Sequence, residues 1–135
     1  MGKSSLILLD THALLWLLSD PQRLSPAARK AIAGAREGGD ELAIADITFL
    51  EIATLSKKGR VGIEMDFASL FRAIETRFSV KPITGRACVK ILELPPTYPK
   101  DPADRIIGAI ALVEGIPLIT ADARIRRSKA VATIW

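Results

Sequence analysis

The sequence predicts an α/β protein, a three-layer α/β/α sandwich with a mainly parallel central sheet. Short apolar segments that suit buried parallel strands alternate along the chain with segments of helical period. Of the 135 residues, 49% are hydrophobic and 25% are charged, which is typical of a globular α/β protein and excludes the disordered and fibrous classes. A chain of this length suits one domain, so residues 1–135 are predicted to form a single domain.

The first half of the chain is expected to form two strands and three helices. Each strand is a short apolar run, and the helices have apolar residues at helical spacing. Ser25 and Pro26 provide an N-cap and a first helical position for the second helix, and Gly59 ends the third. In chain order these elements are a strand over 6–9, helices over 13–18 and 27–36, a strand over 42–45 and a helix over 48–58.

The second half is expected to add three helices and three strands. Pro82 has no amide hydrogen to donate to a neighbouring strand, so the strand that contains it is placed at an edge of the sheet. Gly115 ends the last long helix. The expected elements are a helix around 67–74, a strand over 80–83, helices over 87–94 and 104–114, and strands over 116–119 and 131–134.

Charge and cysteine content restrict the setting of the protein. The formal net charge of +4 permits a polyanionic partner without demanding one. The single cysteine, Cys88, excludes an internal disulfide, suits a reducing compartment and is expected to be buried. Asp10 and His12 interrupt the apolar N-terminal run, which argues against a signal peptide or a membrane span. We therefore expect a cytoplasmic protein without membrane association.

Four acidic residues fall where strands end or helices begin. Asp10 and Asp122 follow the first and fourth strands, while Glu51 and Asp104 lie in first turns of helices. Ligands of open α/β sheets bind beyond the carboxyl ends of the strands, so we expect these acids to gather there. Two carboxylates about 4 Å apart repel by about 4 kcal/mol at an effective dielectric of about 20. Such a cluster requires protonation of some members or bound cations.

Each acid considered alone also has a structural interpretation as a helix cap. Thr48 and Glu51 have the spacing of a capping box, and helix starts favour acidic residues. The stretch "KDPADR" combines both interpretations, with Asp101 as the N-cap and Asp104 as a metal ligand. The candidate caps are Asp10, Thr48 with Glu51, Asp101 with Asp104, and Asp122.

Carboxylate ligands favour Mg²⁺ or Mn²⁺, because oxygen-only ligation suits these hard cations. His12 and Cys88 each stand alone, so the sequence lacks the ligand spacing of a zinc site. A carboxylate-held metal beside basic residues is suited to phosphodiester hydrolysis. The candidates for contact with RNA phosphates are Arg105, Arg124, Arg126 and Arg127.

Four motifs, in order and spacing, resemble the PIN-domain family, in particular the VapC-type toxins of bacterial toxin–antitoxin pairs. They are "LLDTHALLW", "ITFLEIA", "DPADRIIGAIAL" and "LITADARI". The resemblance implies a metal-dependent endoribonuclease with a PIN-like fold, in which Mg²⁺ or Mn²⁺ activates water for attack on an RNA phosphodiester. It also implies a cognate antitoxin protein and a homodimer. The acidic pocket of this family would be formed here by Asp10, Glu51, Asp104 and Asp122.

The resemblance extends to polar residues around that pocket. Thr11 and Thr120 match polar positions that orient carboxylates or waters, and Asp101 matches a flanking acid with a capping or supporting role. His12 is either a general base or a hydrogen-bonding group at a helix start. The alternative function is a metal-free RNA- or protein-binding module of the same fold. A Mg²⁺-dependent phosphatase is a third class, although no Asp-x-Asp pair follows a strand.

Overall fold

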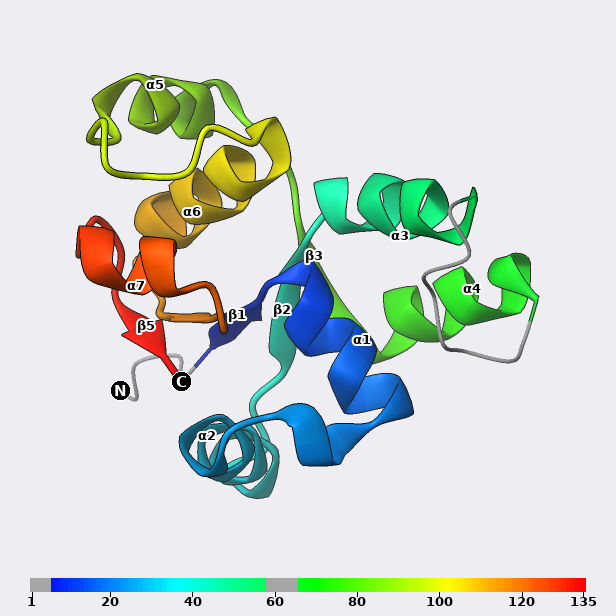
Figure 1. The fold of residues 1–135 in the computed structure, drawn as a ribbon. Coiled ribbons are helices and arrows are strands. Elements are labelled where there is room, and N and C mark those ends of the chain that lie inside the picture. Colours follow the sequence, from blue (N-terminus) through cyan, green and yellow to red (C-terminus); the bar gives the residue numbers. More distant parts are fainter. Residues whose placement is uncertain (1–5, 58–65) are drawn as a thin grey trace.

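A parallel sheet forms the centre of the structure, a computed structural model that describes residues 6–57 and 66–135 (Figure 1). Its strand order is β3-β2-β1-β4-β5, and every neighbouring pair is parallel. The chain order reverses between β1 and β4, so this sheet has its topological switch point there. The strands are β1 (Ile7–Leu9), β2 (Leu42–Ala45), β3 (Phe78–Lys81), β4 (Leu118–Ile119) and β5 (Thr133–Ile134).

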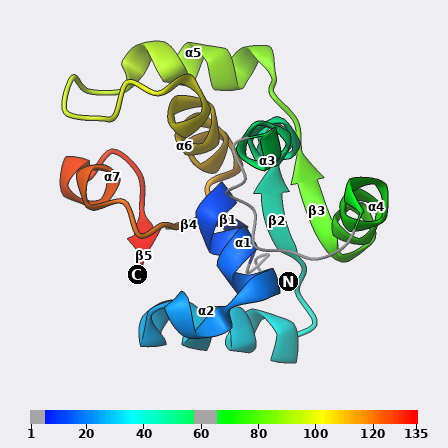
Figure 2. The same ribbon diagram turned by 45° about the vertical axis from the view of Figure 1, so that its right-hand side comes forward.

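Helices cover both faces of this sheet, as Figures 1 and 2 show. One face is covered by α1 (Thr11–Ser19), α2 (Pro26–Glu37) and α4 (Phe67–Arg77). The other is covered by α5 (Gly85–Glu93), α6 (Pro102–Glu114) and α7 (Ala123–Ser128). α3 (Ile47–Lys57) begins beyond the carboxyl end of β2, and a short 3₁₀ helix, Pro21–Arg23, follows α1. No helix in the described ranges is long and apolar enough to cross a membrane.

Alternating side chains along the strands create two separate cores. In β1, Ile7 and Leu9 join the core beneath α1, α2 and α4, whereas Leu8 joins the core beneath α6 and α7. Strand β2 divides in the same way, with Ile44 on the first face and Ala43 on the second. Both sides of the central strands are therefore buried, which explains their uninterrupted apolar sequences. The predicted three-layer α/β/α sandwich is confirmed.

Strands β4 and β5 are each two residues shorter than predicted, and α7 is not among the predicted elements. Three other local expectations need correction. Strand β3 begins at Phe78 and ends at Lys81, two residues earlier than predicted, because Pro82 cannot continue the ladder; its edge position is confirmed. Cys88 is exposed rather than buried, because the neighbouring Ala87 is the residue that α5 buries. Helix α3 begins at Ile47, so Thr48 lies inside it and is not its N-cap. The predicted end of that helix at Lys58 and Gly59 lies outside the described residues.

Tyr98 fixes the start of α6. This side chain is only 1% exposed, and its hydroxyl donates a hydrogen bond to the backbone carbonyl of Asp104 at 3.0 Å. Gly108, one helical turn further along, leaves room for the phenol ring; a Cβ there would come within 2.8 Å of the Tyr98 Cζ atom. The absence of a side chain at Gly108 therefore allows the loop before α6 to dock on the turn that carries Asp104.

Gly108→Ala is expected to destabilise the protein by about 1–3 kcal/mol, because the new methyl group must displace the buried Tyr98 ring. Gly34→Ala is the matched control, since Gly34 is exposed in α2 and its added Cβ would meet nothing within 4 Å. That control is expected to stabilise by about 0.5–1 kcal/mol. Urea denaturation followed by circular dichroism measures both; equal effects would show that Tyr98 is not constrained by Gly108.

Candidate active site

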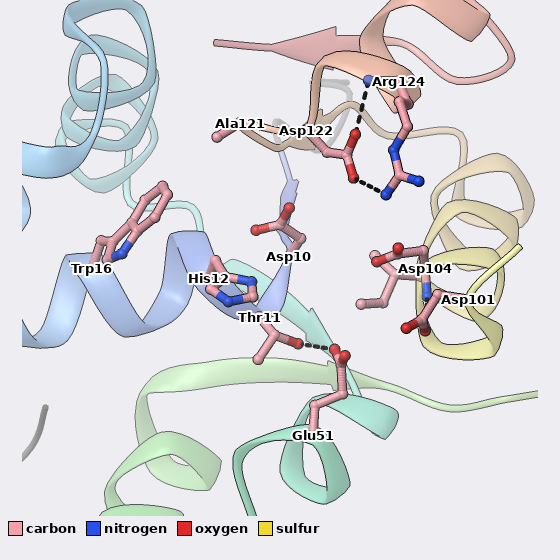
Figure 3. A pocket seen from close by; sticks show the side chains of 11 residues that line it. Asp10, Thr11, His12, Trp16, Glu51, Asp101, Asp104, Ala121, Asp122 and Arg124 are labelled. Carbon is pink, nitrogen blue, oxygen red and sulfur yellow. Dashed lines mark hydrogen bonds and ion pairs between the residues drawn. The ribbon is translucent and has the colours of Figure 1, made fainter. Parts of the chain in front are cut away.

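A cavity of about 390 Å³ lies at the carboxyl edge of the sheet, beside the switch point (Figure 3). Figure 3 shows side chains from separate parts of the chain pointing into it. All four predicted acids line the cavity, together with two of the predicted supporting residues. These six residues are Asp10, Thr11, Glu51, Asp101, Asp104 and Asp122.

Asp10 and Asp122 enter the cavity from the two strands that flank the switch point. The backbone N–H of Asp10 donates to the Ile119 carbonyl of β4 at 3.1 Å, which fixes Asp10 directly after β1. Its Oδ1 caps α1 by accepting from the Ala13 N–H at 2.8 Å. Asp122 caps α7, where its Oδ1 accepts from the N–H groups of Arg124 and Ile125 at 2.8 and 3.3 Å. Both predicted caps are confirmed, and both carboxylates still line the cavity.

Glu51 is held by buried threonines rather than by a capping box. The Thr11 hydroxyl donates to Glu51 Oε1, and it also lies 3.1 Å from the hydroxyl of Thr48. Thr11 and Thr48 are both buried, so this chain of hydroxyls reaches Glu51 from inside the protein. The capping-box interpretation of Thr48 and Glu51 is therefore wrong. Thr48 already lies inside α3, so it cannot be the N-cap of this helix. Its hydroxyl contacts the hydroxyl of Thr11 instead.

Asp101 and Asp104 have different roles at the start of α6. Asp101 Oδ1 accepts from the N–H groups of Ala103 and Asp104 at 2.8 and 3.4 Å, which confirms Asp101 as the N-cap. Asp104 contributes only its main-chain groups to these bonds and to the bond from Tyr98. Its carboxylate faces the cavity, as Figure 3 shows. The expected division of "KDPADR" into a cap and a cavity acid is therefore present in the geometry.

Thr120 is the seventh predicted site residue and is fully buried behind the cavity. Its hydroxyl accepts a hydrogen bond from the Asp122 N–H at 3.1 Å. It fixes the backbone that presents Asp122. Asp46 also follows a strand but faces elsewhere, since its Oδ2 accepts from the Ile83 N–H at 3.0 Å. Position after a strand is therefore insufficient to bring an acid into the cavity; the strands at the switch point supply the two that enter.

The cavity raises the pKa values of two of its acids, Asp104 and Asp10. Burial raises the pKa of Asp104 to about 7, and the negative charges of Asp101, Glu51, Asp122 and Asp10 add to this rise. Burial also raises the pKa of Asp10, with a further contribution from the Glu51 charge. Asp122 differs: burial acts to raise its pKa, but hydrogen bonds from Arg124 and Ile125 and the Arg124 charge lower it overall. The cavity therefore favours partial protonation or added positive charge.

The donor set fits a hard divalent cation. Four carboxylates from four elements face one cavity, and their oxygens are the ligands that Mg²⁺ and Mn²⁺ prefer. Among residues 6–57 and 66–135, no three Asp, Glu, His or Cys side chains already form a metal-binding group. The acids thus share a cavity rather than a finished coordination sphere, and their raised pKa values are what a cation would relieve.

The predicted basic residues separate into different positions. Arg124 lines the cavity and pairs with Asp122 at 3.4 Å between Nη2 and Oδ2. Arg127 lines a neighbouring hollow of about 280 Å³ together with Arg124. Arg126 Nη2 donates to the Ala121 carbonyl at 3.4 Å. Arg105 is half-buried and is not one of the residues that line the cavity.

Sequence reasoning considered His12 but missed Trp16, and so missed the aromatic wall that the two residues form in the cavity. His12 and Trp16 line it, and their ring centroids are 6.0 Å apart. The spacing of these residues, four apart on α1, is a signal that could have placed them on one side of the helix. No hydrogen bond joins the exposed His12 side chain to another residue in the described ranges, and its role, as a general base or as a hydrogen-bonding group, stays a prediction.

Comparison with known proteins identifies the family. Residues 7–130 match the model of the PIN domain family. The chain belongs to the PIN domain family. It is also 37% identical over 131 residues to Ribonuclease VapC22 of Mycobacterium tuberculosis, across 96% of this chain and 98% of that protein. The family assignment made from the four motifs is therefore confirmed.

Solved structures show that the fold of this PIN domain is shared. VapBC2 from Rickettsia felis, bound to a DNA fragment from its promoter, matches with a TM-score of 0.69 at 14% identity, over 95% of this chain and 96% of that chain. DNA-bound VapBC from Salmonella typhimurium matches with a TM-score of 0.69 at 15% identity, over 94% of this chain and 95% of that chain. At these identities the likeness establishes the three-layer fold alone.

The raised pKa of Asp104 predicts how the stability of the metal-free PIN domain changes with pH. A folded-state pKa of about 7, above the ordinary 3.8, means that the folded protein binds the extra proton between these values. The Asp104 contribution to the free energy of unfolding is thus greatest at low pH and is lost as pH rises to about 7.

Asp104→Asn is expected to remove this loss. In a chelator, the free energy of unfolding of the variant, relative to that of the wild type, should rise by about 1–2 kcal/mol from pH 5 to pH 8. This value is smaller than the full pKa shift implies, because solvent screens the partly exposed group. Urea denaturation at the two pH values measures the difference. Glu75→Gln, at an exposed acid of α4, is the control that should show no such gain. A gain of the same size in both variants would contradict the burial of charge at Asp104.

Proposed function

We propose that this PIN domain is a metal-dependent endoribonuclease that acts as the toxin of a toxin–antitoxin pair. The observation that carries the proposal is the convergence of four carboxylates, from four different elements, on one cavity at the switch point of the sheet. The similarity to a ribonuclease across nearly the whole chain supports the choice of RNA as substrate.

Asp10, Glu51, Asp104 and Asp122 would hold Mg²⁺ or Mn²⁺. Such a bound ion lowers the pKa of water to generate a nucleophile and offsets the charge that develops on the phosphodiester. The protein's part is to direct the four carboxylates into one cavity. Thr11 fixes the orientation of Glu51, and Thr120 fixes the backbone of Asp122. Asp101 and Tyr98 fix the turn that carries Asp104.

Arginines on the α7 side of the cavity would contact the RNA backbone. Arg124 stands at the cavity wall, and Arg127 extends the positive charge into the adjoining hollow. Arg126 and Arg105 are not among the residues that line the cavity and would contribute through longer-range attraction. Because Arg124 is already paired with Asp122, it binds a phosphate best once a cation has taken over the charge of that carboxylate.

The proposed partners are a cognate antitoxin and a second copy of the chain. The matched structures from Rickettsia felis and Salmonella typhimurium are VapBC assemblies, which supports an antitoxin as the partner of this chain as well. A homodimer remains a proposal based on the family resemblance.

A metal-free binding module is the second candidate function. It is favoured by one observation: Asp10, Asp101 and Asp122 each cap a helix, so these acids have a structural role that needs no metal. In that case, the basic residues would bind RNA or a protein without cleavage. The two functions differ in their dependence on metal.

Cleavage of end-labelled RNA by the purified, antitoxin-free protein separates these functions. We expect cleavage in Mn²⁺ or Mg²⁺, its loss in EDTA, and a fall of at least about a hundredfold in Asp10→Asn and Asp104→Asn, because several kcal/mol of charge stabilisation depend on the metal. Glu75→Gln should cleave like the wild type. Folded wild-type protein that binds RNA equally with and without metal, and cuts none, would favour the binding module.

A further inference from the structure

A second cavity, of about 430 Å³, opens between α3 and α6 beside the acid cavity. Its walls are mainly apolar and come from Ile47, Leu50 and Leu55 of α3 and from Pro102 and Ile106 of α6. Leu50 is 62% exposed and lies among other apolar residues of this cavity, so it belongs to an exposed apolar patch rather than standing alone. The proposed metal and its carboxylates make no use of these apolar residues.

The two cavities adjoin each other. His12, Glu51 and Asp101 line both of them, so a ligand in the acid cavity can extend into the apolar one without crossing the surface. The His12 imidazole is exposed and stands at the boundary, with the Trp16 ring beside it. In Figure 3 the His12 ring lies between Trp16 and the acids. A ligand at this boundary would therefore contact the aromatic ring of His12.

The charges around the apolar cavity select the kind of group that fits. Glu51 and Asp101 lie at its boundary, and Arg124 lines the acid cavity but not the apolar one. A phosphate is therefore repelled from the apolar cavity and drawn to the acid cavity once a cation is bound. A neutral planar ring meets no such repulsion. The volume far exceeds the ~30 Å³ share of one water and falls in the range of cavities that enclose small ring systems.

We propose that the α3–α6 cavity is a base-binding subsite, which accepts one unpaired base of RNA next to the phosphate held at the acids. The inference rests on the proposed function and names the substrate class of the same site, single-stranded RNA. A base can enter only after leaving its stack, so a paired region is a poor substrate. Leu50 and Ile106 contact one side of the base, and the His12 ring borders it where the two cavities meet.

The test measures RNA binding rather than cleavage. Full-length protein carrying Asp104→Asn, which is expected not to cut, is titrated in Mg²⁺ with short fluorescent single-stranded oligoribonucleotides. A series of these oligonucleotides carries one abasic ribose, moved through each position in turn. Leu50→Gln is added to remove the apolar wall at an exposed site. Leu92→Gln is the matched control, since Leu92 is an aliphatic residue on α5 with 86% exposure and lies outside this cavity.

The subsite predicts that one abasic position weakens binding by about tenfold, and that Leu50→Gln weakens binding of the intact oligonucleotide similarly. In the Leu50→Gln protein the abasic change should then have little further effect, because both changes remove the same contact. Leu92→Gln should behave like the parent. His12→Phe should keep the affinity and His12→Ala should lose part of it, because the ring surface is what contacts the base.

Three results would overturn the inference. The first is equal binding of all abasic oligonucleotides, or no RNA binding at all. The second is an abasic penalty that stays unchanged in Leu50→Gln. The third is unaltered RNA binding in Leu50→Gln together with weakened binding of the antitoxin, which would assign the cavity to a protein segment. Failure of the proposed function is a separate result, since it requires wild-type protein that does not cleave in metal.

Discussion

Repulsion among carboxylates at the carboxyl edge of the sheet is the constraint on which the site depends. Four acids face one cavity, and burial with mutual repulsion raises the pKa values of Asp10 and Asp104. The protein opposes this repulsion with hydrogen bonds to helix N-termini, where the N–H groups carry partial positive charge. Capping and metal binding are therefore compatible: the caps hold the carboxylates in place, and the charge that they leave unbalanced is what attracts a cation.

The fold explains why the acids meet. The strand order reverses between β1 and β4, so the residues after these two strands, Asp10 and Asp122, emerge next to each other. Apolar residues alternate between two cores and hold these strands from both faces. On the α6 side, the close approach of Tyr98 to Gly108 holds the turn of Asp104. Buried packing behind the cavity thus determines where the carboxylate oxygens lie.

Much of this arrangement could be predicted from the sequence. Apolar runs located the strands, turn residues located most helix ends, and the position of each acid relative to these elements predicted the cluster. The exceptions depended on tertiary contacts. Thr48 has the sequence pattern of a cap, yet its hydroxyl on α3 contacts the hydroxyl of Thr11 on α1. Tyr98 lies in an irregular loop, where no periodicity signals its contact with α6. Cys88 lies beside the buried side of a helix, and its exposure depends on how that helix is rotated.

The measurement that tests the carboxylate cluster most directly is calorimetric titration of Mn²⁺ into the full-length, antitoxin-free protein and into its Asp10→Asn/Asp104→Asn double variant. A cluster that needs a cation predicts saturable binding to the wild type, and a weakening of at least about a hundredfold in the variant, because two of the four charged ligands are neutralised. Denaturation in chelator would show that both proteins are folded. Equal affinity in the two proteins, or no saturable binding to folded wild type, would contradict a metal site at these acids.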